Sequence, residues 1–316
     1  MEVKEIRELY TKVLDNIRSV MIGSEEVFSL VFSAMLSGGH VLLEDMPGTG
    51  KTTMAKCIAD SIDAEFKRVQ FTPDLMPQDI TGLNIFSRKS EEFEFIPGPV
   101  FTNILLADEI NRATPRTQSA LLEAMEERKV TVDGVTRELN VPYIVIATEN
   151  PIETTGTFPL PEAQLDRFMI KLTMGDMTNE HEVMMLERFI NDKPQENVTP
   201  VCTSEEIIKA GEAISTVKVS KIVMEYIVAL SDATRKSKKI FSGVSPRASL
   251  NLMRISQAFA AISGRDYVTP DDVRFLSTYV FSHRIIAGAG INGLGETRDL
   301  IKEIVSGVDV PVENWN

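Results

Sequence analysis

Residues 41–52 constrain the fold of this chain more than any other stretch. They read Val-Leu-Leu-Glu-Asp-Met-Pro-Gly-Thr-Gly-Lys-Thr, an apolar run followed by a glycine-rich turn, a lysine and a threonine. An apolar strand that leads through such a turn into a helix is typical of a buried sheet covered by helices. Gly48 and Gly50 allow backbone N–H groups to curl around an anion. The segment therefore predicts a phosphate-binding loop at the end of a core strand.

The polar residues of this loop have separate expected roles. Lys51 is placed to reach the β- and γ-phosphates of a nucleotide, and the Thr52 hydroxyl to bind Mg²⁺. The positive end of the helix that follows adds to the attraction. Asp45 departs from the general pattern, because it stands where the first glycine is expected. Further motifs are needed to decide whether the loop binds a nucleotide.

The composition narrows the class of protein. The chain has 316 residues, enough for two domains, with 43% hydrophobic and 25% charged residues. Its net charge of −13 argues against a protein that grips nucleic acid, which requires a basic surface. Cys57 and Cys202 form neither a disulfide framework nor a metal-binding pattern. No segment reads as a membrane span or a signal peptide, so we expect a cytoplasmic protein.

Hydrophobic periodicity predicts alternating helices and strands in the first half of the chain. An amphipathic helix is expected over residues 2–21, and a second begins after Ser24, which is placed to cap it. Five strand-like runs follow, at 41–44, 66–71, 104–108, 143–147 and 168–172. Two of these runs are continuously apolar, as in strands buried on both faces of a parallel sheet. We therefore expect a five-stranded, mostly parallel sheet between helices.

Two interruptions of this alternation are predicted to be hairpins. Residues 83–100 contain two short apolar stretches among Pro and Gly residues. Residues 129–139 alternate around Asp133-Gly134, a strong two-residue turn signal. Each hairpin follows a helix and precedes a core strand, so both are expected to project from one edge of the domain.

The second half of the chain shows helical patterns only. They occur at 179–191, 203–215, 219–236, 246–263, 270–283 and from 296 onward. Thr269 and Pro270 form a good helix start, with acidic residues in the first turn. The expected organisation is an α/β domain over residues 1–175, which carries the two hairpins, and a small all-helical domain over residues 176–316.

Two further core strands end in polar residues. The apolar run before Asp108 and Glu109 suits a site in which Asp108 holds the Mg²⁺ shell and Glu109 polarises the attacking water. A buried strand before a solvated acidic turn has the same pattern, but Lys51 upstream favours the nucleotide site. Asn150 follows another buried strand and either positions the water or contacts the γ-phosphate, or simply turns the chain before Pro151.

With these motifs in this order, the chain resembles the AAA+ ATPases and, within them, the MoxR group. The resemblance covers about residues 20–285 and rests on five segments: 43–52 (the Walker A motif), 106–113 (the Walker B motif), 118–128, 160–168 and 245–248. An acid at position 45 is common in this group. Glu149 departs slightly from the group's pattern, because glutamine is usual before the sensor asparagine, Asn150.

The resemblance implies roles that the residues alone do not give. Arg167 resembles the arginine finger, which acts in trans on the γ-phosphate of the adjacent subunit and is worth about 10³–10⁵ in rate. Its plain alternative is an exposed arginine that pairs with Asp166. Arg247 resembles sensor 2, carried by a helical lid and contacting the phosphate of its own subunit. Arg112 is a second candidate for an interface arginine, ranked below Arg167.

The same resemblance completes the expected binding residues. Ile22 and Gly23 would flank the adenine of ATP, while Thr52 and Asp108 would hold Mg²⁺, partly through water. The phosphates would be held by Pro47, Gly48, Thr49, Gly50, Lys51, Thr52 and Thr53.

The predicted function is hydrolysis of ATP in a homo-oligomeric ring, expected to be hexameric, whose subunits share active sites. The output would be chaperone-like remodelling of a partner protein, typically one with a von Willebrand factor A domain. The two hairpins resemble the helix-2 and pre-sensor-1 insertions of this branch, which face the pore or the top of the ring. Alternatives are a motor like magnesium chelatase or one acting on DNA, and a nucleotide-gated scaffold that hydrolyses little.

Overall fold

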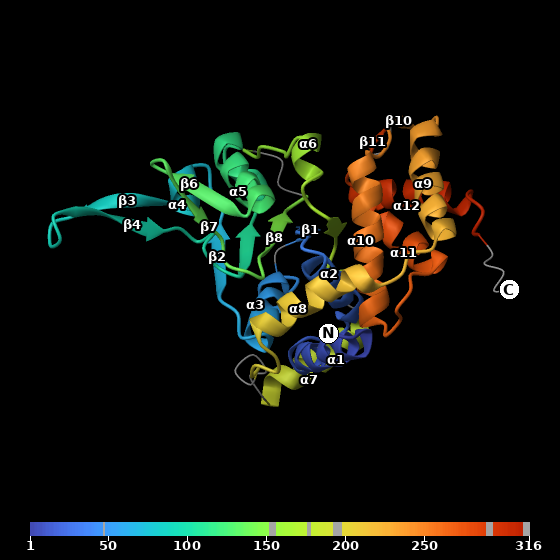
Figure 1. Cartoon of the computed structure of the whole chain (residues 1–316), viewed down its shortest axis with the longest axis horizontal. Coiled ribbons are helices and arrows are strands. Elements are labelled where there is room, and N and C mark those ends of the chain that lie inside the picture. The colour runs from blue at the N-terminus through green and yellow to red at the C-terminus, as the bar shows by residue number, and fades with distance from the viewer. Residues whose placement is uncertain (47, 152–155, 176–177, 192–197, 289–292, 312–316) are drawn as a thin grey trace.

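A five-stranded parallel sheet forms the centre of the molecule (Figure 1). The computed structural model describes residues 1–46, 48–151, 156–175, 178–191, 198–288 and 293–311. The strand order is β2-β5-β8-β1-β9, and every neighbouring pair is parallel. The strands are β1 (Val41–Glu44), β2 (Phe66–Gln70), β5 (Ile104–Asp108), β8 (Ile144–Glu149) and β9 (Ile170–Leu172). The predicted sheet is confirmed.

The central strands are buried on both faces, which explains their continuous apolar sequence. On β1 the side chains of Val41 and Leu43 join one hydrophobic core, whereas Leu42 joins a second core on the opposite face. Neighbouring strands β5 and β8 divide their residues between the two cores in the same alternating way. A strand with two apolar surroundings has no position for a polar side chain until it ends.

Helices cover both faces of the sheet. The helices α1 (Val3–Val20), α2 (Glu25–Leu36) and α3 (Lys51–Ser61) share the first core. On the other face lie α4 (Pro77–Thr81) and α5 (Pro115–Glu127), and the short α6 (Glu162–Leu165) precedes β9. Ser24 precedes α2 as predicted, but its side chain makes no capping hydrogen bond, so the predicted cap is wrong in that detail.

The second half of the chain is helical, as predicted. Its helices are α7 (Asn179–Asn191), α8 (Ser204–Ala213), α9 (Lys221–Lys236), α10 (Pro246–Ile262), α11 (Pro270–Phe281) and α12 (Leu294–Ser306). Thr269 caps α11 by accepting a hydrogen bond from the N–H of Asp272. A small antiparallel pair, β10 (Ile240–Ser242) and β11 (Ile286–Ala287), was not predicted, because two or three residues are too few to show a period.

One hydrophobic core joins the helical region to the sheet. Residues of α10 and α11, such as Leu252 and Val273, belong to the same core as α1 and α2. The predicted boundary after residue 175 adjoins residues outside the described part of the chain and stays a prediction. Within the described residues, no helix is long and apolar enough to cross a membrane.

Two antiparallel hairpins project from the α/β part. One consists of β3 (Gly82–Ser87) and β4 (Glu92–Pro97), and in Figure 1 it extends far from the body of the molecule. The other consists of β6 (Lys129–Val132) and β7 (Val135–Glu138), joined at Asp133 and Gly134, which both have positive φ as a tight hairpin turn requires. Asn84 donates a hydrogen bond of 2.6 Å to Asp133, so the hairpins touch each other.

Candidate active site

The loop after β1 has the geometry of an anion cradle. Gly48 and Gly50 have φ of 87° and 89°, a left-handed conformation that favours glycine. The α3 helix begins directly afterwards at Lys51, so its first N–H groups face the loop. The ammonium group of Lys51 donates to the carbonyl oxygens of Asp45 and Met46, at 3.0 and 3.2 Å. These features suit the phosphates of a nucleotide.

Polar residues from three neighbouring strand ends meet beside this loop. The carboxyl ends of β1, β5 and β8 lie at one edge of the sheet, because the three strands are parallel and adjacent. A pocket of about 330 Å³ at this edge is lined by Gly48, Gly50, Lys51, Thr52, Thr53, Asp108, Glu109 and Asn150, with Asp45, Arg68 and Gln70. Thr49 lies in the loop without lining the pocket, and Pro47 is outside the described residues.

The Asp108 carboxylate is held from two sides. Thr148 donates a hydrogen bond of 2.6 Å to one oxygen, and Arg68 forms an ion pair of 2.6 Å with the other. Thr148 also accepts a hydrogen bond from the backbone N–H of Glu109, so one buried hydroxyl orients both acidic residues. Arg68 and Thr148 are not among the predicted site residues, because Arg68 lies in a run that reads only as a strand and Thr148 lies within the strand that precedes Asn150.

Glu109 occupies an unusual backbone conformation. Its φ of 56° is left-handed, which a residue other than glycine adopts at a cost and which is often found at functional sites. Gln70 donates a hydrogen bond of 2.6 Å to its carboxylate, and Arg112 pairs with the same oxygen at 2.9 Å. Arg112, a candidate for an interface arginine, thus contacts a carboxylate of its own chain here.

The chemistry of the donors fits a magnesium ion as well. Mg²⁺ is usually bound by one or two protein oxygens together with substrate phosphates and water, and needs no protein cage. Thr52 and Asp108 line the same pocket and offer such oxygens. No cluster of three or more His, Cys, Asp or Glu side chains that could hold a metal ion by itself occurs in the described part of the chain.

Asp45 fastens the loop to another part of the fold. Its backbone N–H donates to the carbonyl of Glu149 at 3.0 Å, which continues the β1–β8 pairing. Its carboxylate accepts a hydrogen bond from the backbone N–H of Met174, just beyond β9. Glycine cannot make the second contact, so the acid in place of the first glycine has a structural reason.

A buried lysine pairs with Glu44, the last residue of β1 before the loop. The ammonium group of Lys171 on β9 pairs with Glu44 at 2.5 Å and with Glu149 at 3.2 Å. Burial lowers the pKa of Lys171, but the two carboxylates outweigh this effect and the pKa is raised. Arg298 of α12 donates to the Lys171 carbonyl at 3.0 Å. Glu149, the departure from the MoxR pattern, is therefore one partner of a buried ion cluster.

The predicted adenine residues lie beside the phosphate loop. Gly23 follows α1 with φ of 72°, and a Cβ atom there would approach His181 of α7 to 2.5 Å. A Cβ atom on Gly50 would come within 3.1 Å of Met21, which places this segment next to the loop. Ile22 lies between them and is half-buried. The segment thus lies next to the phosphate loop, and its contact with the base of a nucleotide stays a prediction.

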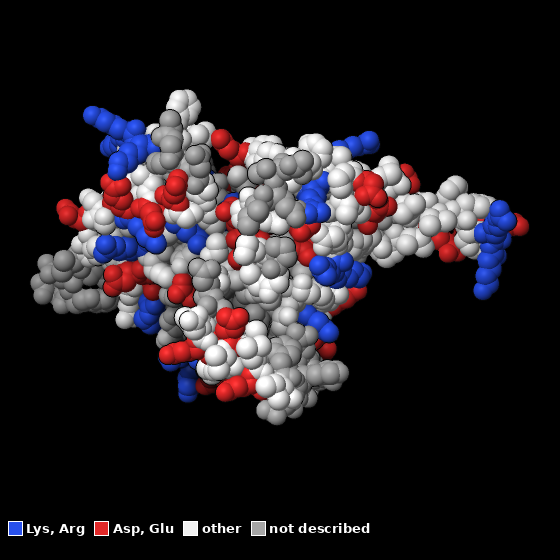
Figure 2. Space-filling view, turned by 180° about the vertical axis from the view of Figure 1, so that it is seen from behind, with Lys and Arg blue, Asp and Glu red and all other residues white. Residues whose placement is uncertain are grey.

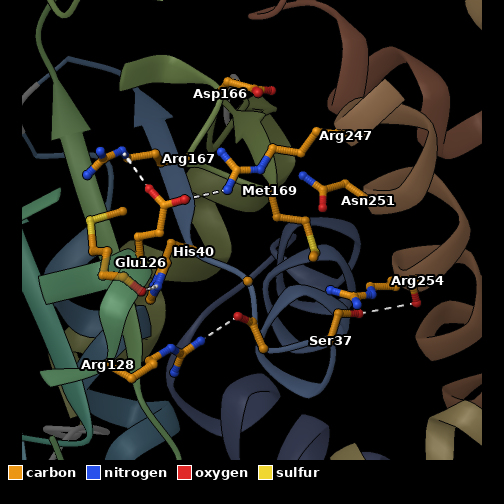
Figure 3. Close-up of a pocket in the computed structure, with 13 residues that line it drawn as sticks. Ser37, His40, Glu126, Arg128, Asp166, Arg167, Met169, Arg247, Asn251 and Arg254 are labelled. Carbon is orange, nitrogen blue, oxygen red and sulfur yellow. Dashed lines mark hydrogen bonds and ion pairs between the residues drawn. The ribbon is translucent and has the colours of Figure 1, made fainter. Parts of the chain in front are cut away.

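The two predicted arginines lie together in a different pocket (Figure 3). One Glu126 oxygen pairs with Arg247 at 2.5 Å, and the other pairs with Arg167 at 3.1 Å. Asp166 accepts a hydrogen bond of 2.6 Å from Arg284, so the alternative pairing of Arg167 with Asp166 does not occur. This arginine pocket has a volume of about 220 Å³ and also includes Arg128 and Arg254.

The arginine pocket lies at the opposite edge of the sheet from the phosphate loop. It is lined by residues 37–40, which precede β1, and by Asp166, Arg167 and Met169, which precede β9. The phosphate loop follows β1, whose four residues span about 13 Å at a rise of about 3.3 Å each. The structure therefore places neither Arg167 nor Arg247 among the residues around the loop of the same chain.

Known proteins share this fold. Residues 40–170 match the "ATPase family associated with various cellular activities (AAA)", and residues 232–304 match the "AAA lid domain". A crystal structure from Cytophaga hutchinsonii, provisionally described as an ATPase, superposes with a TM-score of 0.90 at 35% identity, covering 98% of this chain and 97% of the other. The fold and the phosphate loop thus define an AAA+ protein with its lid.

The relatives give the family within that class. The chain is 38% identical over 284 residues to "Chaperone MoxR1" of Mycobacterium tuberculosis, covering 87% of this chain and 75% of the relative. It is 30% identical over 297 residues to "Protein MoxR" of Methylorubrum extorquens, covering 85% of each chain. The uncharacterised protein YeaC of Bacillus subtilis is 46% identical over 312 residues, 98% and 97% of the two chains. The chain belongs to the MoxR family of AAA+ ATPases.

Proposed function

We propose that this protein binds ATP with Mg²⁺ and hydrolyses it to ADP and phosphate. The observation that carries the proposal is the convergence of Lys51, Thr52, Asp108 and Glu109 on one pocket from separate strand ends. Lys51 and the loop N–H groups would hold the phosphates, while Thr52 and Asp108 would hold the metal ion, which neutralises phosphate charge. Glu109 would accept a proton from the attacking water, and Asn150 would orient that water or the γ-phosphate.

The proposed active site is completed by a second copy of the chain. Arg167 and Arg247 lie at the sheet edge opposite to the phosphate loop, so they are out of reach of their own nucleotide. A neighbour whose arginine pocket faces the loop would supply both arginines to the γ-phosphate. The position of Arg247 favours this action in trans over the contact with its own subunit's phosphate that the resemblance implies. A head-to-tail contact of this kind closes into a ring, and six subunits are the number expected for the family.

The proposed output is chaperone-like remodelling of a protein partner. One relative is named a chaperone, which supports this class of activity. In the family the expected partner carries a von Willebrand factor A domain. The projecting hairpin offers an exposed contact surface, since Phe86 and Phe93 are 51% and 72% exposed and their rings stack edge to face. Arg247 lies at the start of α10 in the lid, so phosphate release would act directly on the lid.

A DNA-acting motor is the less favoured alternative. The net charge is −13, and acidic and basic side chains are interspersed over the face shown in Figure 2. DNA-binding surfaces are instead strongly basic. A magnesium-chelatase-like motor shares the same ATPase chemistry and differs in its partner.

Phosphate release by purified protein tests the ATPase proposal against the scaffold alternative. Glu109→Gln is expected to lower the steady-state rate by at least about 100-fold while ATP still binds, because the variant loses the base and keeps the loop. Glu225→Gln, an exposed change on α9, serves as the matched control and should leave the rate unchanged. Equal, very low rates for wild type and Glu109→Gln would contradict hydrolysis and favour a nucleotide-gated scaffold.

A mixing experiment tests the shared site. Arg167→Ala and Lys51→Ala are each expected to be inactive alone, the first by about 10³-fold or more. In a mixture, the intact loop of the first variant can meet the intact arginines of the second, so activity should return. Failure of any mixture to recover activity would mean that both residues serve a site within one chain.

A further inference from the structure

Glu126 is the common partner of the two arginines. It lies near the end of α5, and each of its carboxylate oxygens contacts one arginine, Arg247 at 2.5 Å and Arg167 at 3.1 Å (Figure 3). Hydrogen bonding from Arg247 outweighs the effect of partial burial and lowers the pKa of Glu126, with the charge of Arg167 adding to it. One carboxylate therefore bridges an arginine of the α/β part and an arginine of the lid.

The backbone that carries Glu126 is fixed on both sides. Arg128 ends α5 with φ of 55°, and its guanidinium donates to the carbonyls of Gly38 at 2.5 Å and Tyr143 at 2.7 Å. The buried ring of His40 bonds to the carbonyl of Met125 at 3.1 Å. The last turn of α5 is thus tied to the start of β1 and to the segment before β8, which makes Glu126 a rigid support.

The segment that carries Arg167 is fixed as well. Arg284, which follows α11, donates to the Asp166 carboxylate at 2.6 Å and to the carbonyls of Phe168 and Met169 at 2.5 and 3.0 Å. This guanidinium is almost fully buried, so the contacts exclude water. The backbone on both sides of Arg167 is held, and its long side chain remains the part whose direction must be set.

We propose that Glu126 is a positioning residue that holds Arg167 and Arg247 as a pair directed at one phosphate of the neighbouring subunit. The proposal rests on the shared site described above. Arg167 contacts Glu126 through Nε, so this ion pair does not use the N–H donors of its two terminal nitrogens, which could contact a phosphate. Two arginines that converge on one anion repel each other, and a carboxylate between them offsets that repulsion before the phosphate arrives. Outer contacts of this kind typically change activity by 10–100-fold.

A Glu126 carboxylate that blocked the two arginines would have the opposite effect on the rate of hydrolysis. A carboxylate that occupied the place of the phosphate would compete with it, and its removal would speed hydrolysis. The side chain of Glu126 is 35% exposed, so its ion pairs contribute little to folding and its replacement is expected to leave the fold intact. Kinetic effects of a Glu126 variant therefore report on the arginines and not on unfolding.

The first test compares Glu126→Gln with Glu225→Gln, the same change at an exposed position of α9. Glu126→Gln is expected to lower kcat about 10–100-fold with KM for ATP changed less than about twofold, because the loop that binds ATP is untouched. The thermal midpoint should match that of Glu225→Gln, whose kcat stays at the wild-type value. An unchanged or raised kcat, or a loss of ATP affinity equal to the loss of kcat, would overturn the proposal.

The second test asks whether the loss acts on the neighbour. Glu126→Gln mixed with Lys51→Ala should regain hydrolysis, since the intact loop of the first variant meets the intact arginines of the second. Arg167→Ala mixed with Lys51→Ala tests the shared site independently. If the Arg167 mixture recovers and the Glu126 mixture does not, the role of Glu126 is refuted and the shared site stands. If neither recovers, the shared site itself is refuted.

Discussion

Replacing Lys171 with methionine is expected to destabilise the protein by about 3–5 kcal/mol. The side chain of Lys171 is only 11% exposed, and its ammonium group lies between the carboxylates of Glu44 and Glu149, which are nearly as buried. Methionine fills a similar volume, so the change removes the charge without opening a large cavity. The cost arises because two buried carboxylates lose the cation that they share, and breaking a buried pair by removing one partner costs about this much.

The expected loss of stability is large enough to be measured by thermal unfolding. Unfolding entropy is about 2.1 cal/mol/K per residue, which for 316 residues gives about 0.7 kcal/mol/K. A loss of 3–5 kcal/mol then lowers the thermal midpoint by about 4–8 °C, which circular dichroism at 222 nm resolves. The exposed pair Lys239–Glu303 provides the control, because Lys239→Met removes a cation at the surface and should cost less than about 1 kcal/mol.

A double variant separates the electrostatic cause from a packing defect. In Lys171→Met/Glu149→Gln one of the two unpaired charges is gone, so the double variant should be more stable than Lys171→Met alone. If Lys171→Met lies within 1 kcal/mol of wild type, the ion cluster does not contribute as its burial indicates. A double variant no more stable than the single one would show that lost packing, and not unpaired charge, causes the defect.

Three further outcomes follow from single contacts. Burial lowers the pKa of His40 to about 3, below its unfolded value of about 6.5, so the stability it contributes is present above pH 6.5 and is lost as the pH falls. Urea unfolding at pH 7 and pH 5 should differ by about 2 kcal/mol through this residue, and His40→Gln should reduce the difference. Asp45→Gly is expected to weaken ATP binding about tenfold in a titration with a fluorescent analogue, because the loop loses its bond to Met174; unchanged affinity would refute this. Thr148→Val should raise the Mg²⁺ concentration for half-maximal hydrolysis about tenfold, since Asp108 loses a hydrogen bond; an unaltered requirement would contradict it.

The parts of the fold that the sequence predicts well are those determined by neighbouring residues. Continuous apolar runs mark the buried strands, and the glycines of the loop mark positive φ. Asp108 and Asn150 could be assigned to the same pocket as Lys51 because the ends of parallel strands share one edge. That rule needs only the order of the elements, which the hydrophobic pattern supplies.

The parts that could not be predicted depend on contacts between distant residues. Asp45 bonds to a backbone N–H beyond β9, and a backbone group has no signature in the sequence. Lys171 lies within a run that reads simply as a strand, and nothing local shows that the ends of β1 and β8 bring Glu44 and Glu149 to its ammonium group. The position of Arg247 depends on how the lid packs on α1 and α2 through the shared core, so its sequence motif gives its role but not its side of the sheet.

The strand β1 separates the two halves of the proposed active site within one chain. The phosphate loop follows β1, and residues 37–40 of the arginine pocket precede it, so a doubly buried strand about 13 Å long lies between the two halves of the proposed site. This strand contributes side chains to both hydrophobic cores, which holds it in place. In the proposed ring, each half would depend on another copy, and the lid arginine Arg247 would lie on the half that contacts the neighbour's nucleotide. In the proposed ring, the phosphate state of one subunit would accordingly act on the lid of the next subunit, through Arg247 and the Glu126 carboxylate that holds it.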